Sequence, residues 1–195
     1  MAFDPRTSDE SDAALMVRSG DGDPAAAAEL YRRHANAVYR FAWASTGSES
    51  EAADVLQETF MTVLERRSGF DPARGSCTAY LCGMARHLVY RRFDSRTEPT
   101  ADIDELAEQS DAFPVLPPPH DHLERAQALR RLHAAIRGLP PHYRDVLILV
   151  ELQELSYADT AAIAGIEVGT VRSRLARARA RLAELLGASI ASTDG

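Results

Sequence analysis

The residues best suited to contact another molecule lie near the C-terminal end of the chain, where arginines recur at helical spacing. One face of a helix starting near Gly169 would carry Thr170, Ser173, Arg174, Arg177 and Arg181. Hydroxyls in the first turns and arginines along the helix suit a DNA major groove, because guanidinium groups pair with guanine or hold phosphates. No acidic residue interrupts residues 170–182. The pattern predicts a DNA-binding helix in preference to an ordinary solvated arginine face.

A shorter helix is expected just before this one, and the pair has helix-turn-helix spacing. Ser156 followed by Asp159 is a capping-box start, and Gly165 can take the positive φ that ends the first helix. The core side of the second helix would consist of Val171, Leu175, Ala178 and Leu182. Residues 156–186 are therefore predicted to form a helix-turn-helix.

A second basic segment ends the helix expected over residues 78–94. It contains Arg86, His87, Arg91 and Arg92, interleaved with the aromatic residues Tyr80, Tyr90 and Phe93. Such a mixture can hold a nucleic-acid backbone by charge and stack exposed bases. The alternative is that the aromatic rings pack inward and the arginines face solvent. The residues alone leave both interpretations open.

An acidic face is expected on the helix over residues 49–67. Asp54, Glu58, Met61 and Glu65 share this face, and the opposite, core side would consist of Leu56, Phe60, Val63 and Leu64. Taken by itself, such a face is most simply a solvated one.

The elements that carry these residues are all helical, with no strand pattern and no repeat, which predicts an all-α protein. Two small helical domains, residues 13–96 and 122–187, would be joined by a flexible acidic linker over residues 97–121 that is interrupted by prolines. Residues 1–12 and 188–195 are expected to be unstructured tails.

The charge distribution excludes a protein that coats nucleic acid with its whole surface, because the net charge is −7. All 22 basic residues are arginine, and residues 97–122 carry seven acidic residues and no basic one. Residues 123–187 have a net charge of +3. The negative charge is therefore concentrated away from the predicted DNA-binding helix.

Other function classes find little support in the sequence. Cys77 and Cys82 are expected to be reduced thiols packed as small apolar residues, and no histidine–cysteine motif with metal-binding spacing accompanies them. We therefore predict no metal and no cofactor. No Gly-rich phosphate loop or nucleophile–base pair indicates an enzyme. Without an apolar run long enough for a membrane span, and without a signal sequence, a cytoplasmic location is expected.

Three groups of motifs resemble those of the extracytoplasmic-function (ECF, group 4) sigma factors of bacterial RNA polymerase, within the sigma-70 family. Residues 54–60 (DVLQETF) look like the region 2 helix that binds polymerase, and residues 74–87 look like the promoter-melting segment. Leu139-Pro-Pro, residues 155–157 and residues 168–179 look like region 4. The likeness covers both expected domains in the right order.

The resemblance implies three sets of contact residues. Core polymerase, through the β′ clamp helices, would contact Asp54, Gln57, Glu58, Met61 and Glu65. The −10 element would contact Arg74, Ser76, Tyr80, Arg86, His87, Arg91 and Arg92. The −35 element would contact Thr170, Arg172, Ser173, Arg174, Arg177 and Arg181.

The resemblance also implies partners. These are core RNA polymerase (with the β flap as well as the clamp), promoter DNA and an anti-sigma factor, while the acidic linker would run toward the RNA exit path as a mimic of nucleic acid. Cys77, Tyr80, His87 and Arg91 depart from the residues common in the family, which affects the −10 sequence recognised rather than the class. A stand-alone helix-turn-helix regulator that binds operators as a dimer is the alternative, but it leaves residues 13–96 without a role.

Overall fold

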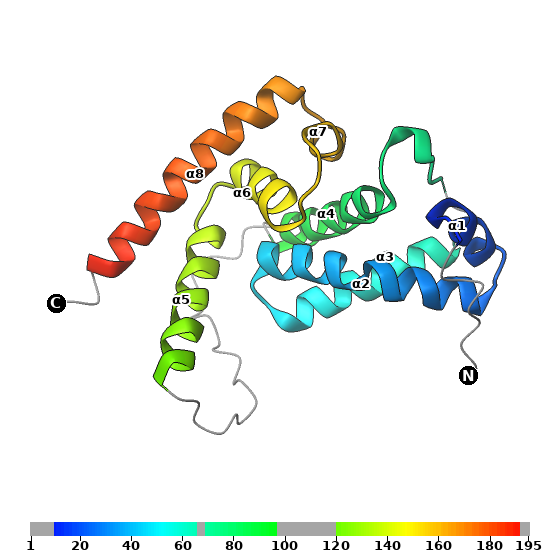
Figure 1. The fold of residues 1–195 in the computed structure, drawn as a ribbon, viewed down its shortest axis with the longest axis horizontal. Helices are drawn as coiled ribbons and strands as arrows, with labels where there is room; N and C mark the ends of the chain where they lie inside the picture. The colour runs from blue at the N-terminus through cyan, green and yellow to red at the C-terminus, as the bar shows by residue number, and fades with distance from the viewer. Residues whose placement is uncertain (1–9, 66–68, 97–119, 192–195) are drawn as a thin grey trace.

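The computed structural model describes residues 10–65, 69–96 and 120–191, and every regular element within those ranges is helical (Figure 1). The N-terminal unit contains α1 (Asp12–Gly20), α2 (Pro24–Thr46), α3 (Glu49–Glu65), a 3₁₀ turn (Pro72–Arg74) and α4 (Cys77–Arg96). The C-terminal unit contains α5 (His120–Arg137), α6 (Pro141–Leu147), a π-helical turn (Ile148–Leu152), α7 (Tyr157–Ala164) and α8 (Val168–Ala191). The all-α prediction is confirmed.

Helix α2 is the centre of the N-terminal unit, and α1, α3 and α4 pack around it. It begins where the sequence indicates, because Asp23 caps it by accepting the backbone amides of Ala25 and Ala26. Gly47, with φ of 76°, ends it. The buried side chains around α2 include Phe41, Leu15, Met16, Leu30 and Leu81.

The two cysteines both lie on α4 and are free and buried, as expected. Burial raises the pKa of each thiol to about 12, and for Cys77 the charge of Asp12 adds to this effect. Both therefore hold their protons at neutral pH.

The apolar side of α3 differs from the prediction by part of a turn. Phe60 and Val63 are buried as expected, but Leu64 is 42% exposed. The buried stripe continues instead through Val55 and Thr59, whose hydroxyl donates to the Val55 carbonyl over 2.7 Å. A side chain that satisfies its own polar group within the helix can occupy a core position in place of a leucine.

The helix-turn-helix forms as predicted in the C-terminal unit. Ser156 Oγ accepts the Asp159 amide over 3.0 Å, and Gly165 ends α7 with φ of 66°. Along α8, Val171, Leu175 and Ala178 are buried, and Leu182 is half-buried. Within the described ranges no helix is both long enough and apolar enough to cross a bilayer.

Three predicted boundaries need correction. Ser11 caps α1 and Asp12 is its first residue, so the N-terminal tail is shorter than 1–12 where the structure describes it. Helix α5 begins at His120, inside the expected linker, and α8 continues to Ala191, past the expected domain end at residue 187. Residues 97–119, the rest of the linker, lie outside the described residues.

The two units are packed against each other rather than separated (Figure 1). The rings of Trp43 on α2 and His133 on α5 lie 4.0 Å apart between centroids. Arg144 donates to the Ser45 carbonyl over 3.1 Å, and Arg40 donates to the Leu152 carbonyl over 2.9 Å. The linker is therefore not the only connection between the two predicted domains, because their helices also contact each other directly.

Glu29 makes the N-terminal unit sensitive to acid. The carboxylate is buried and accepts from Arg32 and Arg33, and these bonds lower its pKa to about 2. Because an unfolded glutamate titrates near ~4.3, Glu29 stabilises the fold above that pH, and the contribution is lost as the pH falls toward 2.

We expect Glu29→Gln to lower the free energy of unfolding at pH 7. The difference in this free energy between the variant and the wild type should become smaller as the pH falls toward 2. Denaturant titrations over this range measure the effect, with the exposed Glu184→Gln as a control that changes stability little at pH 7. An unchanged Glu29→Gln deficit at the lowest pH would contradict the assignment.

Candidate polymerase and DNA interfaces

The acidic face of α3 lies on the solvent side of the helix. Asp54, Gln57, Met61 and Glu65 are exposed, and Glu58 is half-buried. Its position results from the register of α3, because the buried residues Val55, Thr59 and Val63 turn the opposite side toward α2. The five residues predicted to bind polymerase thus form one continuous surface.

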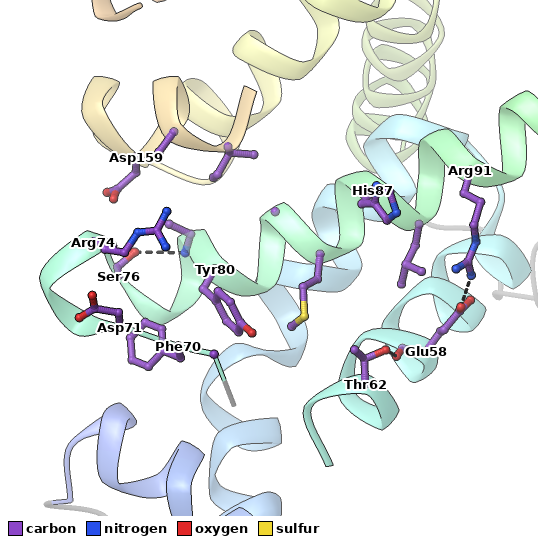
Figure 2. Close-up of a pocket in the computed structure, with 18 residues that line it drawn as sticks. Glu58, Thr62, Phe70, Asp71, Arg74, Ser76, Tyr80, His87, Arg91 and Asp159 are labelled. Atoms are coloured by element: carbon purple, nitrogen blue, oxygen red, sulfur yellow. Dashed lines mark hydrogen bonds and ion pairs between the residues drawn. The ribbon is translucent and has the colours of Figure 1, made fainter. Parts of the chain in front are cut away.

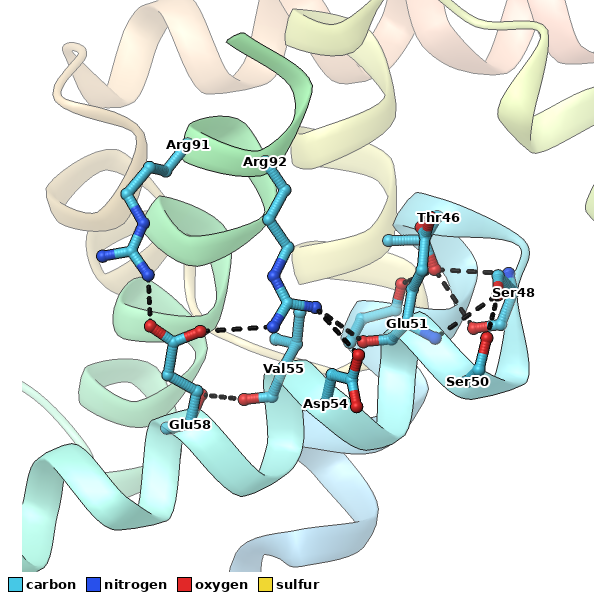
Figure 3. Close-up of polar contacts among 11 residues, drawn as sticks. Thr46, Ser48, Ser50, Glu51, Asp54, Val55, Glu58, Arg91 and Arg92 are labelled. Carbon is cyan, nitrogen blue, oxygen red and sulfur yellow. Dashed lines mark hydrogen bonds and ion pairs between the residues drawn. The ribbon is translucent and has the colours of Figure 1, made fainter. Parts of the chain in front are cut away.

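Two arginines of α4 reach this acidic face, as Figure 3 shows. Arg91 is hydrogen-bonded to Glu58, and Arg92 Nη2 lies 3.2 Å from the other carboxylate oxygen of Glu58. Arg92 Nη1 also lies 3.8 Å from Asp54. The sequence assigned these arginines and acids to different partners, whereas the fold brings them together, so part of the charge on each surface is neutralised by the other.

A pocket of about 540 Å³ opens between α3, the loop over residues 69–76, α4 and α7. Figure 2 shows Phe70 and Tyr80 side by side in it, with ring centroids 5.5 Å apart. Five of the seven predicted −10 residues contribute to its lining: Arg74, Ser76, Tyr80, His87 and Arg91. Aromatic rings beside cationic side chains in a volume of this size can accept a flat base.

The loop that forms one wall of the pocket is held by local hydrogen bonds. Asp71 accepts the Ala73 amide over 3.0 Å, and Ser76 caps α4 by accepting the Ala79 amide over 3.1 Å. Gly75 has φ of 151°, and a Cβ there would lie 2.7 Å from Asp159 Oδ1. Glycine is therefore favoured at Gly75 by its backbone conformation, whereas the contact with the end of the Asp159 side chain could be relieved by a side-chain movement.

Arg86 is not placed as the sequence predicts, because it faces the C-terminal unit. Its Nε donates to Asp145 Oδ2 over 2.6 Å, and the Tyr90 hydroxyl donates to the same oxygen over 2.8 Å. The Arg86 guanidinium also lies over the Tyr90 ring, 4.6 Å from its centroid. Burial, followed by the negative charge of Asp145, raises the pKa of Tyr90 to about 12. A buried carboxylate needs such donors, which explains why Arg86 turns away from the pocket.

The residues that α6 and α7 bring to this region could not be predicted from the sequence. Asp145 is 5% exposed, and Asp159, Ala162 and Ile163 form the α7 side of the pocket. They lie far along the chain from the pocket loop, so no local spacing could have identified them. Arg92, which was predicted to join the −10 set, is not part of the pocket lining and pairs with α3 instead.

The predicted DNA-binding face of α8 is accessible. Arg172, Ser173, Arg177 and Arg181 are exposed, while Thr170 and Arg174 are half-buried. Arg181 pairs with Glu184 over 2.6 Å, and Arg179, outside the predicted set, pairs with Glu151. Among the described residues, Arg174 and Arg177 have no ion-pair partner. Their charges are therefore free for an external anion.

Known families match both units. The model of sigma-70 region 2 matches residues 30–98, and that of sigma-70 region 4 matches residues 129–182. The region 2 match covers most of the N-terminal unit, which a stand-alone helix-turn-helix regulator would leave without a role.

Individual proteins agree with the family models. The ECF RNA polymerase sigma factor SigM of Mycobacterium tuberculosis is 31% identical over 180 residues, which cover 92% of this chain and 86% of SigM. SigE of Mycolicibacterium smegmatis is 34% identical over 163 residues, covering 81% of this chain but only 60% of SigE.

Solved structures show the same relationship. The sigma factor RpoE, in complex with the anti-sigma factor NepR from Bartonella quintana, is 26% identical with a TM-score of 0.63, over 80% of this chain and 94% of RpoE. CnrH, in complex with the cytosolic domain of CnrY, is 25% identical with a TM-score of 0.66, over 92% of this chain and 99% of CnrH. The chain belongs to the extracytoplasmic-function RNA polymerase sigma factors of the sigma-70 family.

Proposed function

We propose that this protein binds core RNA polymerase in the cytoplasm and directs transcription initiation from promoters that it recognises at their −10 and −35 elements. The observation that carries the proposal is the presence of two accessible faces of different chemistry on different units. One is the acidic face of α3, and the other is the arginine face of α8 with its unpaired Arg174 and Arg177. A protein that consisted only of a DNA-binding module would not need the acidic face of α3.

The residues of each face have distinct roles in this proposal. The clamp helices of the β′ subunit contact the acidic face of α3, which consists of Asp54, Gln57, Glu58, Met61 and Glu65. Region 4 binds the β flap. The pocket between Phe70, Tyr80 and His87 receives a base of the −10 non-template strand. Extracting a base costs a few kcal/mol, which stacking on aromatic rings can offset. The first turns of α8 enter the major groove of the −35 element.

The closed arrangement of the two units favours a resting state in this scheme. Helix α7 forms one side of the pocket, and Asp145 holds Arg86. We infer that the units separate when the −10 strand enters, so that Arg86 and the pocket become accessible. Because the solved relative RpoE is a sigma factor in complex with the anti-sigma factor NepR, a partner of that class is also proposed here.

Charge reversal tests the docking face. We expect Asp54→Arg combined with Glu65→Arg to weaken core polymerase binding by about tenfold or more, because like charges then oppose each other across the interface. Binding is measured by fluorescence anisotropy with labelled protein. Glu49→Arg, on the same helix but on another side, is the control. Equal affinities for the double variant and the wild type would exclude this face from docking.

Single substitutions test the −35 face. Arg177→Ala should weaken binding of the holoenzyme to promoter DNA by about 1–3 kcal/mol if the arginine contacts a base. Arg179→Ala is the matched control, since Arg179 is paired with Glu151 in the free protein. Promoter fragments with altered −35 sequences distinguish a base contact from a phosphate contact. A loss of the same size for both variants would argue against a specific role for Arg177.

The Asp145 contact tests the closed state. Asp145→Asn removes the charge that holds Arg86 and Tyr90, so we expect a larger radius of gyration by small-angle X-ray scattering. We also expect tighter binding of a −10 single-stranded oligonucleotide. Glu151→Gln, which alters an ion pair within the C-terminal unit, should change neither quantity. Circular dichroism shows whether both variants remain folded. A folded Asp145→Asn protein with wild-type dimensions and affinity would rule out this contact as the restraint.

A further inference from the structure

Three side chains capable of binding a metal ion meet in the N-terminal unit, and none of them belongs to the polymerase- or DNA-contact residues assigned above. They are Asp12, His34 and Cys77, and their ligand atoms all lie within 4.8 Å of one another. Each comes from a different helix: Asp12 is the first residue of α1, His34 lies within α2, and Cys77 is the first residue of α4. Carboxylate, imidazole and thiolate are the three groups with which proteins bind zinc.

The imidazole of His34 is aimed into this cluster. The side chain is 9% exposed, and its Nδ1 lies 3.1 Å from the hydroxyl of Thr78. When Nδ1 donates its proton to Thr78, Nε2 presents a lone pair toward the cluster. Nε2 is buried and makes no hydrogen bond, although Asp12 Oδ2 lies only 3.1 Å away. In this tautomer the two facing lone pairs repel each other, and either a proton or a metal ion between them removes the repulsion.

Asp12 is already oriented for this role. Arg33 donates to its Oδ1 over 2.8 Å, which leaves Oδ2 directed at His34. Arg33 is in turn bound to the buried carboxylate of Glu29 over 2.7 Å. Ligating carboxylates are commonly fixed by outer hydrogen bonds of this kind. The pair of carboxylates also offsets the positive charge that Arg33 brings near the cluster.

Cys77 supplies the soft ligand. It follows Ser76, the cap of α4, so its sulfur lies at the positive end of a helix dipole, where a thiolate is stabilised. A cysteine binds a metal ion as the thiolate, after loss of its proton. A bound metal ion displaces that proton, which passes to solvent buffer while the sulfur lone pair forms the bond.

We propose that Asp12, His34 and Cys77 bind one divalent transition-metal ion of the zinc type, with a fourth position left for water. Tetrahedral zinc bonds of about 2.0–2.3 Å place neighbouring ligand atoms roughly 3.3–3.7 Å apart. The separation between His34 Nε2 and Asp12 Oδ2 is close to this value, and the other ligand atoms, which all lie within 4.8 Å of one another, need to approach by at most about 1 Å.

The site has a structural consequence for the promoter-binding unit. Metal binding joins the start of α1 to α2 and to the start of α4, directly beside Ser76 and the pocket loop. The ion thereby fixes the end of α4 that anchors this loop. The binding itself is independent of the polymerase and DNA roles proposed above, so either proposal can fail alone.

Cobalt substitution of the full chain tests the site. We expect the chelator-treated protein to bind one equivalent of Co²⁺ and to show both thiolate-to-cobalt charge-transfer absorption and the visible bands of tetrahedral cobalt. Zn²⁺ should displace the Co²⁺, and Zn²⁺ added to the metal-free protein should release one proton and raise the melting temperature. Cys77→Ala should lose the charge-transfer band, whereas Cys82→Ala, the same change at a buried cysteine on the same helix, should keep it.

Two further variants keep the test decisive if Cys77→Ala folds poorly. Asp12→Asn should weaken Zn²⁺ binding in a chelator competition, and Thr78→Val, which removes the hydrogen bond that orients His34, should weaken it about 10–100-fold. The proposal is overturned if folded wild-type protein gives no charge-transfer band, in which case His34 and Asp12 form only an ion pair. It is also overturned if the band survives in Cys77→Ala or disappears equally in Cys82→Ala.

Discussion

The arrangement of the molecule depends on the buried carboxylate of Asp145. A charge that is 5% exposed cannot remain without donors, and the donors come from the other unit, as Arg86 and the Tyr90 hydroxyl on α4. Satisfying Asp145 therefore brings α6, and α7 with it, against α4. The same contact makes α7 a wall of the pocket and removes Arg86 from it. This buried ion pair thus acts with the Trp43–His133, Arg144 and Arg40 contacts to hold the units together, and it determines the accessibility of Arg86.

The arginines of this sigma factor are distributed between internal and external tasks. Because every cation among its 22 basic residues is an arginine, each can form a bidentate pair with a carboxylate or with a phosphate. Arg91 and Arg92 are engaged with α3, and Arg33 is engaged with Glu29 and Asp12. Arg174 and Arg177 have no such partner among the described residues. Residue type therefore identified where anions can bind, while the pairing within the fold decides which arginines remain free to bind them.

Helix α4 connects these features. Its first residue belongs to the Asp12–His34–Cys77 cluster, its middle forms the pocket with Tyr80 and His87, and Arg91 and Arg92 near its end contact α3. The side chains of one rigid helix change position together more readily than those of separate loops. Three events act on α4: the separation of the two units, the binding of a DNA strand and the contact with polymerase. Because they share this helix, each event can influence the other two.

The features that depend on near neighbours in the chain could be predicted from the sequence. Helix periodicity, the Asp23 and Ser156 caps, the end at Gly165 and the buried stripe of α8 all involve residues within a few turns, so local patterns specify them. Three other features could not be predicted in this way: Leu64 is exposed, Arg86 binds Asp145, and Asp12, His34 and Cys77 meet. These contacts join residues distant in the chain, and they depend on how buried charges and apolar faces are satisfied when the helices pack together. No spacing along the sequence encodes that choice.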